Sequence, residues 1–158
     1  MARSQQLQKF LQTTQNAFSA SGAKTDALVV ADKIFSTADA KPGIAANPDA
    51  VEVPACKYLG VALESAKAEG GPIANLALAL EGIAPHLKWG LRPNGENDDA
   101  TFKACHANAV VVGKDGLEER DDIRIGMSLL APETRYPDHR HPPEEIYTVL
   151  TPGEWKQG

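Results

Sequence analysis

Four side chains able to bind a metal or move a proton fall within nine residues: His139, His141, Glu145 and Tyr147. Successive side chains of a β-strand point to opposite faces, so residues an even number apart share a face. If this segment is a strand, all four side chains point the same way. Two imidazoles and one carboxylate on a β scaffold suit a single divalent ion of Zn, Fe, Mn or Ni and leave coordination positions open for a substrate. The residues alone do not choose the metal.

Two other interpretations of this segment are weaker. A helical zinc site of the HExxH type has a different residue order, and Pro142 and Pro143 remove two backbone donors from the middle of the group. A polar surface hairpin is the other alternative, but two of the four histidines in the chain stand one residue apart here. His86 and His106 have no potential ligand at even spacing beside them, so we predict structural or surface roles for both.

The elements that must position this segment change in type along the chain. Up to residue 84 the apolar residues recur at helical spacing, which predicts helices that end before Gly22, that run from Thr25 as N-cap to Lys41, and that cover 54–68 and 73–84. After Pro85 the period falls to about two, with short β-rich runs at 86–91, 107–112, 123–130 and 145–151. Turn-forming clusters stand at 92–95 and 113–116. The expected fold class is therefore α+β in a single domain, with a helical region at 1–84 and an antiparallel β region at 85–158.

Composition narrows the functional classes. The chain has 158 residues, enough for one domain with one core. Its formal net charge is −5 and its Lys and Arg residues are scattered, which argues against a nucleic-acid partner. Cys56 and Cys105 match no metal-binding spacing and are interpreted as structural. The first residues are too polar for a signal peptide and the longest apolar stretch is too short to span a bilayer, so we expect no membrane association and a cytoplasmic location.

The metal-ligand segment resembles a known motif. Gly126, the pair His139 and His141, Glu145 and Gly153 resemble the first motif of the cupins, which are double-stranded β-helix barrels. A closer likeness covers Tyr136-Pro-Asp-His139-x-His141-Pro-Pro-Glu144-Glu145-x-Tyr147, followed by Pro-Gly-Glu-Trp155. This pattern is similar to that of the cupin-type dimethylsulfoniopropionate (DMSP) lyases of marine bacteria. The tyrosine two residues after the metal glutamate is not a general cupin feature, so this second likeness is more specific than the first.

The resemblance implies a role for each matching residue. His141 and Glu145 would bind the metal, Tyr147 would bind it or act as the catalytic base, His139 would line the same site, and Tyr136 would contribute to the substrate pocket. The implied reaction is cleavage of DMSP, a small zwitterion, to dimethyl sulfide and acrylate. Tyr136, and by the same chemistry Trp155, could hold the sulfonium by cation–π attraction.

The resemblance also implies a second cupin motif with a further histidine ligand. The printed sequence ends at Gly158, before any residue that could take that part. We therefore expect an incomplete barrel, completed in a longer gene product or by association of copies, and weak or absent activity from the chain as printed. Two alternatives remain open at this point: another metal cupin such as an isomerase or a dioxygenase, and a non-catalytic cupin-like binding module.

Overall fold

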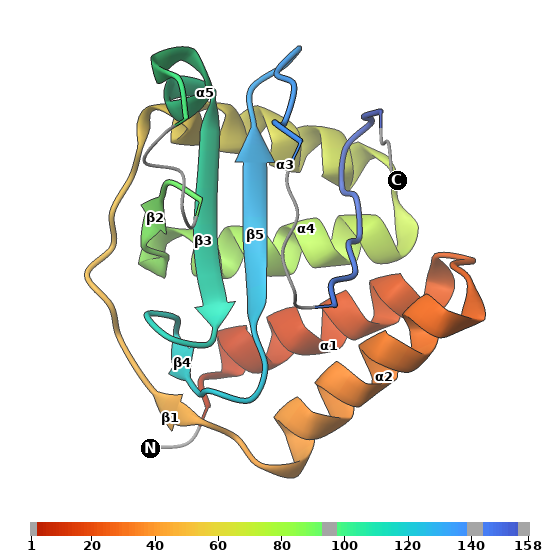
Figure 1. Cartoon of the computed structure of the whole chain (residues 1–158). Coiled ribbons are helices and arrows are strands. Elements are labelled where there is room, and N and C mark those ends of the chain that lie inside the picture. Colours follow the sequence, from red (N-terminus) through yellow and green to blue (C-terminus); the bar gives the residue numbers. More distant parts are fainter. Residues whose placement is uncertain (1–2, 93–97, 139–143, 155–158) are drawn as a thin grey trace.

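The structure is a computed structural model that describes residues 3–92, 98–138 and 144–154. Its first half is helical (Figure 1). The α-helices there are α1 (Gln5–Ala20), α2 (Thr25–Ala40), α3 (Leu59–Ala68) and α4 (Gly71–Ile83), and the 3-10 helices are η1 (Pro54–Tyr58) and η2 (Ala84–His86). The remaining elements are a short helix α5 (Ala100–Cys105) and the strands β1 (Ile44–Ala45), β2 (Trp89–Gly90), β3 (His106–Val112), β4 (Glu118–Glu119) and β5 (Ile125–Leu130). The predicted α+β class is confirmed.

The described strands form one mixed sheet. β3 is central and pairs antiparallel with β2 on one side and with β5 on the other. The expectation of a purely antiparallel sheet is wrong, because β4 pairs parallel with β3 at Val112 and antiparallel with β1. β1 lies in the connector between two predicted helices of the front half, where no strand was predicted. Closure into a cupin barrel is not seen among these strands.

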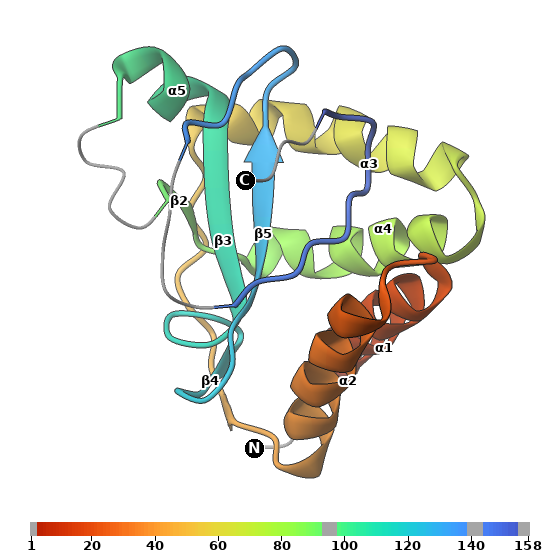
Figure 2. The same cartoon turned by 45° about the vertical axis from the view of Figure 1, so that its right-hand side comes forward.

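Helices α1, α3 and α4 lie on one face of the sheet, and α2 packs against α1, as two views of the ribbon show (Figures 1 and 2). α4 packs against both α1 and α3. The buried side chains of the helices and of the sheet face that they cover form one hydrophobic cluster, which includes Leu7, Phe10, Leu76, Leu80, Trp89 and Val111. The core therefore lies between the helical layer and the sheet, and it leaves the opposite face of the sheet available for a site.

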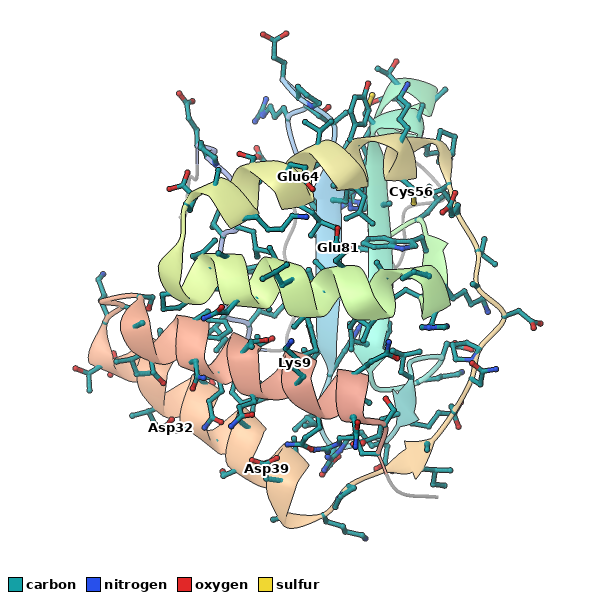
Figure 3. The ribbon with its side chains drawn as sticks, turned by 180° about the vertical axis from the view of Figure 1, so that it is seen from behind. Lys9, Asp32, Asp39, Cys56, Glu64 and Glu81 are labelled. Carbon is teal, nitrogen blue, oxygen red and sulfur yellow. The ribbon has the colours of Figure 1, made fainter. Side chains whose placement is uncertain are left out.

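The far side of the helical layer is polar. Figure 3 shows this side with Lys9 and Asp32 on α1 and α2, and with Glu64 of α3 and Glu81 of α4. Lys67 Nζ lies 2.5 Å from a Glu64 oxygen and 3.1 Å from a Glu81 oxygen, so one ammonium links the two helices. The helices thus have one buried face and one charged face, as amphipathic surface helices do.

Local sequence signals account for both ends of α1. The Ser4 hydroxyl accepts a hydrogen bond from the Leu7 N–H at 3.2 Å and caps α1, and Gly22 follows the helix with φ +66°. The predicted N-cap role of Thr25 is wrong, since Thr25 is the first residue of α2 and the cap position is Lys24. The predicted third helix begins as 3-10 helix at Pro54 and continues as α-helix only from Leu59.

The back half departs from the predicted strand ranges in three places. Of 86–91 only Trp89 and Gly90 are strand, and α5 was not predicted. Residues 145–151 form no strand. The predicted turn at 113–116 is confirmed, with Gly113 and Asp115 both at positive φ, whereas the predicted turn at 92–95 falls almost entirely outside the described residues.

Candidate active site

The open face of the sheet carries polar residues at the end where β3 begins. Ala107, Ala109 and Val111 belong to the core cluster, so the alternate residues of β3, which include His106 and Asn108, face the other way. The register places Ser128 of β5 opposite Asn108. His106 Nε2 lies 3.3 Å from the Ser128 hydroxyl oxygen. This end of the sheet is therefore polar on the side away from the helices.

Three rings pack together at this end. The rings of Phe102 and His106 stack with centroids 4.8 Å apart, and the ring of Tyr136 meets them edge-on at 5.4 Å and 5.2 Å. The helix cap explains where Phe102 lies, since the Asp99 carboxylate accepts the Phe102 N–H at 2.9 Å and starts α5. Segments from α5, β3 and the stretch after β5 thus converge on Tyr136.

His106 is 1% exposed, and its Nδ1 has no hydrogen-bond partner within the described part of the chain. Burial, together with the positive charge of Arg92, lowers the pKa of His106 below its ordinary value. Its imidazole is therefore neutral at neutral pH and acts as a flat packing surface beside Tyr136.

An ion pair borders the rings. Arg92 Nε and Nη2 donate to the two carboxylate oxygens of Asp98 at 2.7 Å and 2.5 Å, and both side chains are largely buried. The guanidinium carbon of Arg92 lies 5.6 Å from the Phe102 ring centroid and 5.4 Å from that of Tyr136. The hydrogen bond to Arg92 holds the pKa of the Asp98 carboxyl below its usual value, so the pair is charged on both sides.

Glu145 and Tyr147 lie on the segment 144–154, which starts in front of the sheet and passes beside β5 toward the helices (Figures 1 and 2). The Tyr147 hydroxyl donates a short hydrogen bond to a Glu145 carboxylate oxygen. Partial burial, and then this bond, raise the pKa of Tyr147 well above its usual value. The sequence predicted that these two side chains point the same way, and their hydrogen bond agrees with that prediction.

The segment keeps the predicted alternation without the predicted strand. Glu145, Tyr147 and Val149 are exposed, while Ile146 and Leu150 pack against the core cluster. Among the described strands β5 pairs only with β3, so its outer edge forms no ladder with this segment. Packing of alternate apolar residues holds the segment in place instead of backbone pairing.

Tyr136 lies near this pair. Burial raises the pKa of Tyr136, and the charges of Arg92 and Glu145 also act on that pKa in opposite directions. Tyr136 in turn contributes to the raised pKa of Tyr147. The structure therefore brings Tyr136, Glu145 and Tyr147 within electrostatic reach of one another, from positions up to eleven residues apart.

The other predicted site residues, His139, His141 and Trp155, lie outside the described residues. Within 3–92, 98–138 and 144–154, no group of three or more His, Cys, Asp or Glu side chains could hold a metal ion. The predicted ligand set of His141, Glu145 and Tyr147 accordingly stays a prediction. Its described members do fit a divalent ion chemically, since a carboxylate and a phenol oxygen are already in contact.

Comparison with known proteins identifies the family. The family model for dimethylsulfoniopropionate lyase matches residues 27–158. The chain belongs to the dimethylsulfoniopropionate lyase family. A relative from Cereibacter sphaeroides, named "Putative dimethylsulfoniopropionate lyase DddL", is 27% identical over 128 residues, which are 81% of this chain and 53% of that protein. The chain thus spans about half the length of the curated relative that it matches. No solved structure matches it.

In this member of the DMSP lyase family, the contacts of several residues with Tyr136 were not predicted from the sequence. His106 was predicted to be a structural or surface residue, and Arg92, Asp98 and Phe102 were given no site role. One signal was present, since Asn108 follows His106 at even spacing and shares its face of β3. The approach of Arg92 and Phe102 to Tyr136 has no signal in the spacing, because it depends on how β2 and α5 pack.

Two hollows lie away from this cluster. One is lined by residues around the β3–β4 turn and the stretch up to Arg124, and the other by Ala46–Val51 with Lys88 and the same turn. Neither is lined by Tyr136, Glu145 or Tyr147. No helix in the described part of the chain is long and apolar enough to cross a bilayer.

Proposed function

We propose that this chain carries the site of a metal-dependent lyase that cleaves DMSP to dimethyl sulfide and acrylate by β-elimination. The family match over residues 27–158 carries the proposal. The hydrogen bond from the Tyr147 hydroxyl to Glu145, within electrostatic reach of Tyr136, supports it at the level of the site. The finer assignment, a carbon–sulfur lyase acting on a small zwitterion, rests on the family and on a distant relative.

The reaction requires a base next to a bound carboxylate. Tyr147 as phenolate takes a proton from the carbon beside the DMSP carboxylate, the electron pair of that C–H bond forms the C=C bond of acrylate, and the C–S bond breaks so that dimethyl sulfide leaves with its electron pair. A proton is thus transferred, and no electrons are gained or lost overall. The carbon acid is weak, so the developing enolate-like charge must be stabilised.

The residues divide the work between binding and proton transfer. His141, Glu145 and Tyr147 would hold one divalent ion, which when bound supplies Lewis-acid stabilisation of the carboxylate end and favours the phenolate of Tyr147. Without a cation the Tyr147 hydroxyl keeps its proton and donates it in the hydrogen bond to Glu145, and the pKa of Tyr147 is raised, so Tyr147 is a poor base by itself. Tyr136 and His139 would bind the substrate, with the Tyr136 ring facing the sulfonium.

The test is headspace detection of dimethyl sulfide from protein loaded with Zn²⁺, Fe²⁺ or Mn²⁺ and mixed with DMSP. Tyr147→Phe removes the base, and we expect the rate to fall by at least about 100-fold. Tyr58→Phe is the matched control, because Tyr58 ends η1 outside the site. The assay is run on the chain alone and on any longer gene product that contains it. The proposal would be overturned if neither form released dimethyl sulfide with any of the three metals. Full activity of Tyr147→Phe would also overturn it.

A further inference from the structure

The Tyr136 side chain is held by contacts from three other parts of the chain. Arg92 follows β2, Phe102 belongs to α5 and His106 opens β3. Each of the three lies within 5.4 Å of the Tyr136 ring centroid, measured from a ring centroid or from the guanidinium carbon. The stretch that carries Tyr136 has no helix or strand of its own between Ala131 and Asp138. The position of this side chain therefore depends on the residues around it.

Arg92 contacts both aromatic neighbours and an acid at once. Its guanidinium lies over the rings of Phe102 and Tyr136 while two of its N–H groups bind Asp98. A planar guanidinium can stack on rings and keep a bidentate carboxylate contact, whereas the ammonium of a lysine is a compact charge that cannot do both. Asp98 thus fixes the plane of Arg92, and Arg92 in turn limits where the Tyr136 ring can lie.

The rest of the packing leaves Tyr136 little freedom. His106 and Phe102 are 1% and 4% exposed, so the two rings against which Tyr136 packs are themselves fixed. His106 is held at Nε2 by Ser128, on the neighbouring strand. The Tyr136 ring meets both rings edge-on, a favoured aromatic geometry.

We propose that Arg92, oriented by Asp98, is a positioning residue that holds the Tyr136 side chain in place beside Glu145 and Tyr147. This inference rests on the proposed function for its consequence in catalysis, but the positioning itself can be measured without turnover. Supporting groups of this kind typically change activity by about 10- to 100-fold when removed, although they never touch the substrate.

The first measurement follows the tyrosines directly. The chain has three tyrosines, Tyr58, Tyr136 and Tyr147, so ring ¹³C labelling gives few signals, and each is assigned by its Tyr→Phe variant. In Asp98→Asn, and separately in Arg92→Lys, we expect the Tyr136 signal to shift or broaden while that of Tyr58 stays in place. Two variants are used so that loss of folding in one, judged by circular dichroism, leaves the other to decide.

A matched control comes from a second pair of the same kind. Arg120 binds Asp122 through Nε and Nη2 at 2.6 Å and 2.8 Å, and this pair is separate from the Phe102, His106 and Arg92 side chains that pack on the Tyr136 ring. Asp122→Asn should leave the Tyr136 signal unchanged. An unchanged Tyr136 signal in folded Asp98→Asn and Arg92→Lys, or an equal change in Asp122→Asn, would overturn the proposal whether or not the protein has lyase activity.

The second measurement asks whether the positioning matters for the reaction. In Asp98→Asn we expect kcat/KM for DMSP to fall by about tenfold, mainly through a raised KM, because Tyr136 would contact the substrate and not take the proton. When Asp98→Asn is combined with Tyr136→Ala, which removes the ring, the second substitution should add less than its separate effect, since both act through the Tyr136 ring. Additive losses would contradict a role through Tyr136. A wild type that releases no dimethyl sulfide, either as this chain or within a longer gene product, would overturn the proposed function, while a shifted Tyr136 signal in the variants would still support the positioning.

Discussion

At the scale of single residues, Glu118 is surrounded by positive charge in the interior. Its side chain is 1% exposed, and its oxygens accept hydrogen bonds from Arg3 Nε at 2.7 Å, Arg3 Nη2 at 3.0 Å and the Gly43 N–H at 3.0 Å. Arg120 Nη1 lies 3.6 Å away. Residues near the start of the chain are thereby tied to β4 and to the strand β1 beside it. The burial of Glu118 is offset only while its carboxylate is charged.

We predict that Glu118→Gln lowers the free energy of unfolding by about 3 kcal/mol at neutral pH, because the buried guanidinium groups of Arg3 and Arg120 lose their buried counter-charge and keep only the more exposed Asp39 and Asp122. Burial raises the pKa of Glu118, but the hydrogen bonds from Arg3 and Gly43 outweigh it and hold that pKa below the usual value. A lowered pKa contributes stability above the ordinary value of about 4.3, and this is lost as the pH falls through the folded-state pKa.

The measurement is urea unfolding of both proteins between neutral pH and acid. The stability difference between wild type and Glu118→Gln should be constant at neutral pH and shrink below about pH 4.3. Glu119→Gln is the control, because Glu119 is the exposed neighbour in β4. A difference that stays constant into acid, or that Glu119→Gln reproduces, would show that the ion pairs of Glu118 are not its source.

Sequence spacing was informative where the evidence is local. Even spacing predicted that Glu145 and Tyr147 share a side, and their hydrogen bond confirms it. His106 was predicted to be a structural or surface residue, and its burial agrees with a structural role. Its packing against Phe102 and Tyr136 was not predictable, since those rings come from other elements. Spacing reports which face a side chain occupies, but not what covers that face.

At the scale of elements, helices were predicted better than strands for a physical reason. The apolar period of α1, α2 and α4 is set within each segment, so their existence could be predicted from their own residues. Residues 145–151 have the alternation of a strand, but a strand also requires a partner, and the edge of β5 is not paired with them. Alternation of apolar and polar residues was therefore not sufficient to predict a strand.

Two glycines in different elements should respond oppositely to the same substitution. A Cβ at Gly126 of β5 would stand 2.9 Å from the Ala109 carbonyl oxygen of β3, whereas a Cβ at Gly82 of α4 would meet nothing within 4 Å. We predict that Gly126→Ala destabilises the protein by about 1–3 kcal/mol through overpacking. Gly82→Ala should stabilise it by about 0.5–1 kcal/mol, because alanine loses less entropy in a helix.

Thermal unfolding of the two glycine variants beside wild type gives the answer. The expected melting temperatures fall on opposite sides of the wild-type value. If Gly126→Ala left the melting temperature unchanged, β3 and β5 could move apart at this point without loss of stability. It would also remove the packing explanation for a glycine that the sequence analysis assigned to the cupin motif.

At the scale of the whole molecule, the helical layer and the sheet share one core. The same hydrophobic cluster contains Leu76 of α4 and Trp89 of β2, and Ile146 and Leu150 pack against it from the segment that carries Glu145 and Tyr147. The candidate site therefore rests on the packing of the helices, although none of its described residues lies on α1 to α4. A substitution that destabilises the centre of α4 should therefore destabilise both the helical layer and the sheet.

We predict that Leu76→Ala costs about 3 kcal/mol, since Leu76 is 1% exposed and truncation leaves a cavity. Leu78→Ala on the same helix is the matched control, because Leu78 is 49% exposed and its truncation should change stability by no more than about 0.5 kcal/mol.

The measurement uses two probes of unfolding, and far-ultraviolet circular dichroism follows the helices. With Trp155→Phe as the background, Trp89 is the one tryptophan left and its fluorescence follows the sheet. Because both probes monitor the same core, Leu76→Ala should lower both midpoints together. A helical signal that shifts alone would mean that the helical layer unfolds independently, and that the sheet face with Tyr136 keeps its shape without it.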